Sequence, residues 1–494
     1  MRSVLVAILL ASVVLAGCSS NPAKNGTSGA SAMPALPVEP NTTYHLGSVE
    51  GQAQSLSSAD LTGNNAPVAA LGGYTWIHAV TFEPSLGITK SGAIFMTSLR
   101  GEGPLGAIQN THVLRGTDHA SAWTDVGPFA TPLLPYSNVP NSNDPFLYVD
   151  PWTSRVIDFD MCGTLSAFCE STSDDDGRTW TLHSIVTGEQ TALDHQSIAA
   201  SPAGETGLTT IGYPNVLVFC VNRGVSGNLV GGSYCSTSID GGITFTPLVP
   251  GFPIGTSQCS GLSAHVKGSG DGRFYRGNPS CSGPAVYRSD DGGLTWSEHT
   301  ISTTTGNLDH EVAVAVDGGN NVHAFWIGAD GLPYLASSRD HGDSWGPVRM
   351  VAVPGVNETG FPAITAGGAG RIAFAYIGAH VEGGYAKDQK GANWTGYIGV
   401  MTDAFADQPL ITTVAINTPD DPLSTGQCGD TRCGGFGDFI DIAVDPEGRP
   451  WAAFAHNGHD GGAGIVGTLL LGPSLLGDVA PLSPITLAGP ASFG

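Results

Sequence analysis

Three arginines stand at the ends of predicted second strands of the repeats and could hold a negatively charged ligand. They are Arg100, Arg223 and Arg276. A guanidinium group forms paired hydrogen bonds with a carboxylate, and basic residues are scarce in a chain that has 19 Lys and Arg against 43 Asp and Glu. We therefore predict that these arginines bind a carboxylate together. The alternative is that each forms a salt bridge with an acidic neighbour.

Acidic and imidazole side chains recur where strands are predicted to begin, and the triplet Leu-Asp-His occurs twice, at 193–195 and 308–310. Such side chains can hold a hard cation or act as general acids and bases. They can equally satisfy backbone N–H groups of loops and do nothing else. No spacing among them is specific for a metal, so no metal site or cofactor is predicted, and Ca²⁺ is the one ion considered. The candidates are Asp144, Asp194, His195, Asp309, His310, Glu311, Glu358 and Asp438.

One eight-residue pattern recurs along the chain and must organise the elements that carry these residues. Its clearest copy, at 289–296, reads Ser-x-Asp-x-Gly-x-Thr-Trp. Others begin at Ser173, Ser238 and Ser338, and a degenerate copy ends at Trp123. Asp and Ser side chains bond to nearby backbone N–H groups in turns, and Gly adopts positive φ. The Thr-Trp pair then begins a strand with its ring buried. The pattern therefore predicts a repeated β-hairpin turn.

The repeated turn resembles the Asp-box of the sialidase and BNR-repeat superfamily. In those proteins the Asp-box joins the third and fourth strands of a β-propeller blade, on the face away from the active site. The resemblance covers most of residues 74–470 and implies an all-β propeller of four-stranded blades. It assigns no chemistry to the turns themselves.

The spacing of the repeats favours seven blades. Trp123 and Trp345 lie 222 residues apart (345 − 123) over four intervals, so each repeat has about 55 residues, a period that fits propeller blades. Six blades are the alternative, if one terminal repeat is degenerate. First strands are predicted to begin near Trp76, Phe146, Ser197, Leu262, Val312, Phe361 and Phe439.

The same resemblance implies roles for the candidate residues. Sialidases hold the carboxylate of their substrate with three arginines, the role suggested for Arg100, Arg223 and Arg276, and they use a Tyr nucleophile activated by a Glu. In this chain Tyr385 and Glu382 would supply that pair and Asp144 the acid, although a solvated Gly-rich loop is the alternative for segment 378–395.

The chain departs from the sialidase pattern in lacking the Arg-Ile-Pro motif, because Ala373 follows Arg371-Ile372. Two hypotheses follow. The first is a sialidase-like glycoside hydrolase that binds a glycan with an acidic sugar. The second is a non-catalytic propeller for a protein, a glycan or a cation, with an assembly factor as a further variant. The sequence leaves it uncertain whether the protein is an enzyme.

The N-terminus predicts export. A basic start is followed by the apolar run 4–15, which is too short to span a bilayer and fits a signal peptide. Leu15-Ala16-Gly17-Cys18 resembles the lipobox of prokaryotic lipoproteins, which implies cleavage before Cys18 and its lipidation. An ordinary secretory signal is the alternative. We predict a signal peptide at 1–17, a lipidated Cys18 with a flexible tether at 18–71, and one propeller domain at 72–494.

The cysteines fit an oxidising compartment. Removing Cys18 from nine Cys leaves eight, an even number that predicts disulfides in an exported chain. A zinc site built from Cys is the alternative, but no Cys-x-x-Cys spacing supports it. The predicted pairs are Cys162/Cys169, Cys220/Cys235, Cys259/Cys281 and Cys428/Cys433.

Charge and composition limit the partners. The net charge of −24 repels nucleic acid and anionic lipid headgroups, while 70 Gly, 33 Pro and only 13% charged residues suit many short strands and tight turns. We expect a monomer that binds a glycan or a cell-surface protein, does not bind nucleic acid, and reaches the membrane only through its lipid anchor.

Overall fold

The computed structural model describes residues 42–46, 48–49, 70–81, 83–100, 110–128, 146–161, 167–186, 193–223, 232–257, 259, 262–279, 281, 283–303, 306, 310–380, 392–425, 439–456, 463–477 and 481–487. All of them belong to one compact unit, Ala35–Gly494, which is distinct from the unit Met1–Pro34. One short helix, α1 (Ala203–Thr206), interrupts a described chain made of strands and turns. No helix in the described part is long and apolar enough to cross a membrane.

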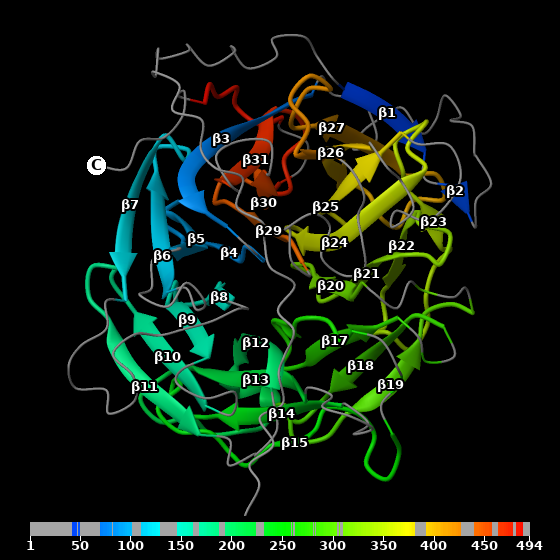
Figure 1. Cartoon of the computed structure of the whole chain (residues 1–494). Coiled ribbons are helices and arrows are strands. Elements are labelled where there is room, and N and C mark those ends of the chain that lie inside the picture. Colours follow the sequence, from blue (N-terminus) through cyan, green and yellow to red (C-terminus); the bar gives the residue numbers. More distant parts are fainter. Residues whose placement is uncertain are drawn as a thin grey trace, which may run out of the picture. The chain divides into compact units, whose positions relative to one another are not determined.

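The strands form seven antiparallel sheets, which are the blades of a β-propeller (Figure 1). Blade 1 contains β4 (Leu86–Ile88), β5 (Ile94–Arg100), β6 (Asn110–Thr117) and β7 (Ala122–Gly127). Blade 2 contains β8 (Phe146–Val149), β9 (Val156–Met161), β10 (Ala167–Ser173) and β11 (Thr181–Val186). Blade 3 contains β12 (Leu193–Pro202), β13 (Asn215–Arg223), β14 (Ser233–Ser238) and β15 (Val249–Pro250). Blade 4 contains β16 (Lys267–Gly268), β17 (Phe274–Asn278), β18 (Ala285–Ser289) and β19 (Ser297–Thr300).

The remaining three blades follow the same order. Blade 5 contains β20 (Val312–Val316), β21 (Val322–Ile327), β22 (Pro333–Ser338) and β23 (Arg349–Met350). Blade 6 contains β24 (Glu358–Ala366), β25 (Ile372–Ala379), β26 (Asn393–Met401) and β27 (Leu410–Ala415), and β28 (Ser424–Thr425) pairs with β26. Blade 7 contains β29 (Asp441–Val444), β30 (Pro450–His456), β31 (Ala463–Leu471) and β3 (Leu71–Val80). Seven four-stranded blades confirm the favoured sequence prediction.

The first strands of the blades lie next to one another around the centre of the ring. Each first strand contacts the next one around the ring, in the order β4, β8, β12, β16, β20, β24 and β29, and β29 contacts β4. The outermost strand of blade 7 is β3, which comes from the N-terminal side and pairs with β31. The prediction that a first strand begins near Trp76 is therefore wrong, because Trp76 belongs to β3 and the first strand of blade 1 is β4.

Two short strands precede the propeller in sequence and extend its outer edge. β1 (Thr42–Leu46) pairs with β27 of blade 6, and β2 (Ser48–Val49) pairs with β23 of blade 5. Both lie inside the segment 18–71 that the sequence predicts to be a tether. The structure therefore places part of this segment against the blades.

The repeated Ser-x-Asp-x-Gly turn joins the third and fourth strands in blades 2 to 5. In blade 4, Ser289 Oγ accepts from the Gly293 N–H at 2.8 Å, and Asp291 accepts from the N–H and the hydroxyl of Thr295 at 2.9 and 2.6 Å. Gly293 has φ +91°, a conformation that a residue with Cβ adopts only with strain. The same bonds recur around Asp175, Asp240 and Asp340. These local bonds explain why so short a sequence pattern specifies the turn.

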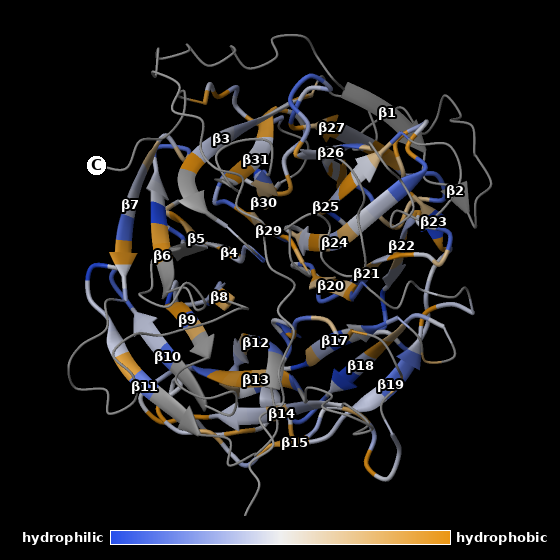
Figure 2. Ribbon diagram, viewed as in Figure 1, coloured by the Kyte–Doolittle hydropathy of each residue, from blue (hydrophilic) through white to orange (hydrophobic). Residues whose placement is uncertain are grey.

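The hydrophobic core lies between neighbouring blades. One cluster joins Phe159 of blade 2 to Ile198 and Phe219 of blade 3, and the two phenylalanine rings stack at 4.8 Å. Another joins Phe95 of blade 1 to Val156 of blade 2. Figure 2 shows hydrophobic residues along the strands and hydrophilic ones at many turns. Because each blade buries one face against the next, the blades stabilise one another.

Polar contacts add to this packing at the turns. Lys90 of blade 1 donates to the Trp152 carbonyl of blade 2 at 2.6 Å. Arg155 of blade 2 donates to the Gly241 carbonyl of blade 3 at 3.0 Å. Successive blades are therefore joined by hydrogen bonds as well as by apolar contacts.

Two of the four predicted disulfides are present in the structure. Cys220–Cys235 crosses from β13 to β14, and Cys259–Cys281 lies in blade 4. The predicted pair Cys428/Cys433 lies outside the described residues, as does Cys18, so that pair and the lipidation of Cys18 stay predictions.

The predicted disulfide of Cys169 is not confirmed. Cys169 lies in β10, where its backbone stands opposite Asp160 of β9 and Ser184 of β11. The side chain of Cys169 is not described, and its predicted partner Cys162 lies outside the described residues. The two disulfides that the structure shows therefore do not include Cys169. Pairing of Cys169 with Cys162 stays a prediction from the sequence.

The turn bonds predict the effect of removing one aspartate. Asp291→Ala deletes the acceptor of the Thr295 bonds and should lower the free energy of unfolding by about 1–2 kcal/mol, measured by denaturant unfolding. The neighbouring Asp290 is the matched control, because it makes surface ion pairs with Arg273 and Arg288. Its replacement by Ala should cost under about 1 kcal/mol. Equal losses in the two variants would contradict the structural role of Asp291.

A buried carboxyl between blades 2 and 3 predicts a pH effect. Glu170 is fully buried and neither carboxyl oxygen has a hydrogen-bond partner among the described residues. Burial raises the pKa of Glu170 well above its usual value. The folded state therefore keeps a proton that the unfolded state releases above pH 4.5, so this group makes folding less favourable as pH rises. Glu170→Gln should raise the melting temperature more at about pH 8 than at about pH 4.5. An equal change at both pH values would contradict this account.

Candidate functional site

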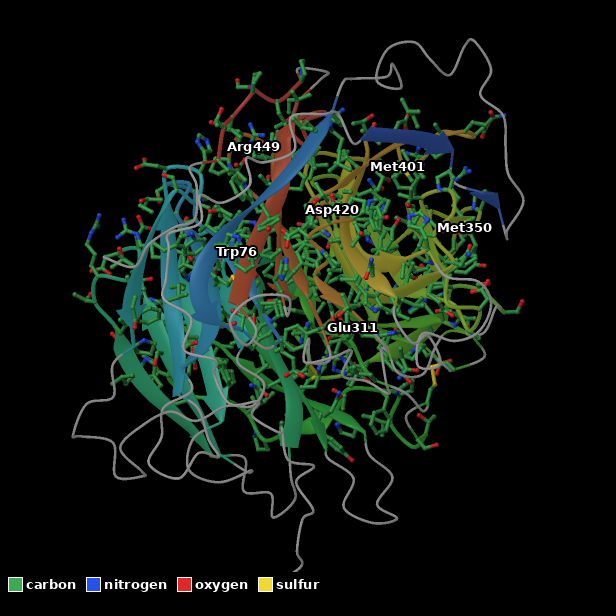
Figure 3. All side chains as sticks on the ribbon, turned by 45° about the horizontal axis from the view of Figure 1, so that its top comes forward. Trp76, Glu311, Met350, Met401, Asp420 and Arg449 are labelled. Carbon is green, nitrogen blue, oxygen red and sulfur yellow. A yellow bond between two sulfur atoms is a disulfide. The ribbon has the colours of Figure 1, made fainter. Side chains whose placement is uncertain are left out.

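Three polar side chains from three consecutive blades meet at the starts of their first strands. His195 lies in β12, His265 lies two residues before β16, and Glu311 directly precedes β20. His195 Nε2 is 3.1 Å from Glu311 Oε2, and His265 Nδ1 is 3.7 Å from the same oxygen. The two imidazole rings stack with centroids 4.3 Å apart. We call His195, His265 and Glu311 the axial cluster; Figure 3 shows Glu311 near the middle of the ring of blades.

Backbone irregularity places the ring of His195. His195 has φ +53°, and the register between β12 and β13 shifts between Asp194 and Ser197. Blade 6 has the same irregularity: Phe361 has φ +56°, and the register of β24 against β25 shifts at this position. Such a bulge re-aims a side chain, and strained residues of this kind gather at functional sites.

Burial controls the protonation of the cluster. The side chains of His195, His265 and Glu311 are all buried. Burial, together with the charges of His195 and Lys267, lowers the pKa of His265 well below its usual value. His265 is therefore neutral at physiological pH. Its Nε2 is buried without a hydrogen-bond partner among the described residues, while its backbone N–H donates to Glu311 at 3.2 Å.

Aromatic rings enclose the two histidines. Phe439 presents its edge to His265 at 4.5 Å and to His195 at 5.5 Å, and Phe146 lies 4.8 Å from His265. These rings lower the local polarity, which strengthens electrostatic interactions within the cluster. The cluster could hold one cation through two imidazole nitrogens and one carboxylate. Ca²⁺ binds through oxygen ligands, so this donor set does not match the one ion that the sequence suggests.

The structure brings together only part of the predicted ring of residues. His195 and Glu311 meet in the axial cluster, whereas His310 packs against Phe361 at 5.2 Å, and burial lowers its pKa to about 4. Asp194 is placed in β12, but its side chain is not described. The residues that lie outside the described ranges are Asp144, Asp309, Glu382, Tyr385 and Asp438.

Sequence reasoning missed His265. The first strand of blade 4 was predicted near Leu262, which made His265 a strand residue, but β16 begins at Lys267. A histidine just upstream of the first strand of blade 4 is the signal that could have found it, because Glu311 also stands just upstream of the first strand of blade 5.

The predicted arginine trio is only partly described. Arg276 is buried within β17, where its guanidinium donates to the Gly251 carbonyl at 2.8 Å and lies over the rings of Tyr287 and Trp296. The bond to Gly251 joins blade 4 to blade 3, and the two rings lie within blade 4. These contacts give Arg276 a structural role. Arg100 and Arg223 end β5 and β13 as predicted, but their side chains are not described. Joint binding of a carboxylate by the three residues stays a prediction.

A second candidate site lies between blades 5 and 6. A pocket of about 350 Å³ is formed by β22, β23 and the repeated turn of blade 5, and by the turn between β26 and β27 of blade 6. We call it the interblade pocket. Its lining residues with rings or charges are Arg339, Trp345, Arg349, Phe405 and Asp407.

The interblade pocket is rich in hydrogen-bond donors. Arg349 is 3% exposed and donates through Nη2 to the carbonyls of Ala406 and Asp407, while its buried Nη1 has no partner among the described residues. The Nε1 of Trp345 is likewise unpartnered there. Arg339 lies over the Phe405 ring at 3.9 Å. The exposed guanidinium of Arg339 suits a ligand that carries acceptor oxygens, whereas the two unpartnered nitrogens are themselves buried.

Comparisons with known proteins find similarity to solved structures at low sequence identity. No family model and no curated protein matches the sequence. A lectin from Burkholderia pseudomallei, BP39L, is 13% identical with a TM-score of 0.46, over 83% of this chain and 100% of that chain. The NanB sialidase from Streptococcus pneumoniae is 12% identical with a TM-score of 0.41, over 81% and 92%. The intramolecular trans-sialidase from Ruminococcus gnavus is 13% identical with a TM-score of 0.35, over 76% and 89%. These values do not define what this chain binds.

Proposed function

We propose that this protein is a glycan-binding propeller that holds an acidic sugar in the interblade pocket without hydrolysing it. The observation that carries the proposal is the buried guanidinium of Arg349, whose Nη1 has no partner among the described residues although it borders an open pocket. Arg349 donates to two carbonyls through Nη2, but a buried N–H group without an acceptor, such as that of Nη1, is still costly. A carboxylate that binds the exposed guanidinium of Arg339 could also pair with Arg349 Nη1 once the lining moves to uncover that nitrogen.

The shape and lining of the pocket favour a small ligand with one apolar face. Its volume of about 350 Å³ lies at the lower end of the range for small-molecule sites. Trp345 and Phe405 supply aromatic surface, and the two arginines supply the charge. A single acidic sugar residue, such as the end of a glycan, combines an apolar ring face with a carboxylate.

The acidic groups at the pocket support binding rather than hydrolysis by a pair of carboxyl groups; hydrolysis through a Tyr nucleophile, as in sialidases, is a different mechanism. Glycoside hydrolysis by the common mechanism needs two carboxyl groups on either side of the scissile bond. Asp407 is the one carboxyl residue among the described residues that line the pocket. The alternative of a sialidase-like enzyme rests on Tyr385 and Glu382, which lie outside the described ranges.

We propose further that the protein works outside the cytoplasm, anchored through a lipid on Cys18. The lipobox-like sequence Leu15-Ala16-Gly17-Cys18 supports the anchor. The disulfides Cys220–Cys235 and Cys259–Cys281 support an oxidising compartment.

The binding proposal predicts a selective effect of one exposed arginine. Purified full-length protein in detergent is titrated by calorimetry with methyl α-sialoside and methyl glucuronide, and with methyl glucoside as the neutral sugar. We expect at least one of the acidic sugars to bind and the neutral sugar to bind at least about 10-fold more weakly, because it lacks the carboxylate. Arg339→Gln should weaken acidic-sugar binding about 10-fold, the effect of about 1.4 kcal/mol for one charged hydrogen bond.

The matched control is Arg178→Gln, an exposed arginine in the repeated turn of blade 2 and outside the pocket. It should leave binding unchanged. The proposal fails if neither acidic sugar binds at millimolar concentration, if the neutral sugar binds equally well, or if Arg339→Gln and Arg178→Gln have the same effect.

The anchor proposal predicts a covalent lipid on one residue. Cells of a bacterial host that expresses the full chain are fed an alkyne analogue of palmitate, and the protein is tested for label and for its partition between membrane and soluble fractions. We expect label and membrane association in the wild type, and neither in Cys18→Ser. A Cys433→Ser variant is the control and should keep the label. Label that persists in Cys18→Ser would refute anchoring at this residue.

A further inference from the structure

We infer that the axial cluster is a binding site for a divalent transition-metal ion, with His195, His265 and Glu311 as its protein ligands. The three residues come from blades 3, 4 and 5, and a ligand atom from each lies within 4.8 Å of the others. The sequence alone does not predict a metal site made of these three residues. The site is separate from the interblade pocket, so the inference goes beyond the proposed sugar binding.

The distances fit a site that closes slightly around an ion. Zinc binds imidazole nitrogen and carboxylate oxygen at about 2.0–2.2 Å, so two ligand atoms in tetrahedral geometry lie roughly 3.4 Å apart. His195 Nε2 and Glu311 Oε2 are 3.1 Å apart, and His265 Nδ1 is 3.7 Å from the same oxygen. The two values lie on either side of the expected spacing. The two imidazole rings are stacked and their lone pairs lie in the ring planes, so one ring must turn for both nitrogens to face the same ion.

The donor set selects the class of metal. Two imidazoles with one carboxylate suit zinc, iron and related first-row ions, whereas calcium and magnesium prefer oxygen ligands. Three protein ligands also leave at least one coordination position for water or for a ligand, as in catalytic zinc sites. Because the ligands stand at the starts of the first strands, that position belongs to the end of the propeller axis at which these strands begin.

The state of His265 supports metal binding independently of the distances. A buried polar nitrogen without a partner is costly, and Nε2 of His265 is such an atom among the described residues. The ring of His265 offers two nitrogens, Nδ1 on the side of Glu311 and Nε2, which is unpartnered among the described residues. Either ring nitrogen could then bind the ion, and a rotation of the ring would exchange them.

The surroundings provide an ordered shell with mixed charge. Phe146 and Phe439 pack against the histidine rings and limit their movement. Lys267 begins β16 two residues after His265, and its positive charge opposes a dication. Asp441, at the start of β29, is a further carboxyl group that interacts electrostatically with Glu311.

The test titrates the full-length protein with metal after treatment with a chelator and dialysis. Calorimetry with ZnCl₂ should show one tight site per chain, and CaCl₂ should compete at least about 100-fold more weakly. Titration with CoCl₂ should give visible absorption bands of a four- or five-coordinate ion. Glu311→Gln keeps the size and hydrogen-bonding oxygen of the side chain but removes the charge, so it should weaken zinc binding roughly 100-fold and remove the cobalt bands.

Two further variants make the result decisive. His265→Gln should give the same loss, which guards against a folding defect in Glu311→Gln; thermal melts of the metal-free proteins measure folding directly. His119→Gln is the matched control, because His119 is exposed in the degenerate turn of blade 1 and should keep zinc and cobalt binding.

Three results would overturn the inference: no stoichiometric zinc binding by the wild type, equal binding by wild type and Glu311→Gln, or calcium binding as tight as zinc. A cluster that serves stability alone would lower the melting temperatures of both variants and leave metal titrations unchanged. Sugar binding at the interblade pocket is read separately, so either proposal can fail without the other.

Discussion

The structure depends on closing a ring from the two ends of the propeller sequence. β3, at residues 71–80, pairs with β31, at residues 463–471, and so completes blade 7. Each blade buries its apolar faces against its neighbours, so an open ring would expose one face at each end. The same closure fixes the positions of the first strands around the axis. The axial cluster needs that order, because no single blade carries more than one of its ligands.

Local features of this fold could be predicted from the sequence, and distant pairings could not. The repeated turn is specified by bonds within eight residues, such as those of Ser289 and Asp291, so its sequence pattern identifies the blades. Trp76 was misplaced for the opposite reason. Its strand is apolar like a first strand, and nothing near it in the sequence shows that its partner is Ile465. The predicted number of blades is nevertheless correct, because it was derived from the length of the sequence repeat.

A residue of a candidate site could be predicted only where its position along the blade determines its place in the structure. His195 and Glu311 could be predicted because the starts of first strands meet near the axis. His265 could not, because the predicted start of the first strand of blade 4 lies a few residues before the observed start of β16. Arg276 shows the limit of counting positions, since it lies inside β17 and its guanidinium is used between blades. The interblade pocket was missed because it combines Arg339 with Phe405, residues of two blades that no local pattern connects.

The two candidate sites use different parts of the blades and opposite charges. The axial cluster is built where first strands begin and carries a carboxylate, which attracts cations. The interblade pocket is built from third and fourth strands and their turns, and its buried arginine attracts anions on a chain whose net charge is −24. An acidic surface weakens long-range attraction of an anionic ligand. Affinity in the pocket must then come from short-range bonds, such as those offered by Arg349 and Arg339. The same negative surface attracts a cation to the axial cluster. Added salt screens this charge, so the affinity of the cation and the affinity of the anionic sugar should change in opposite directions.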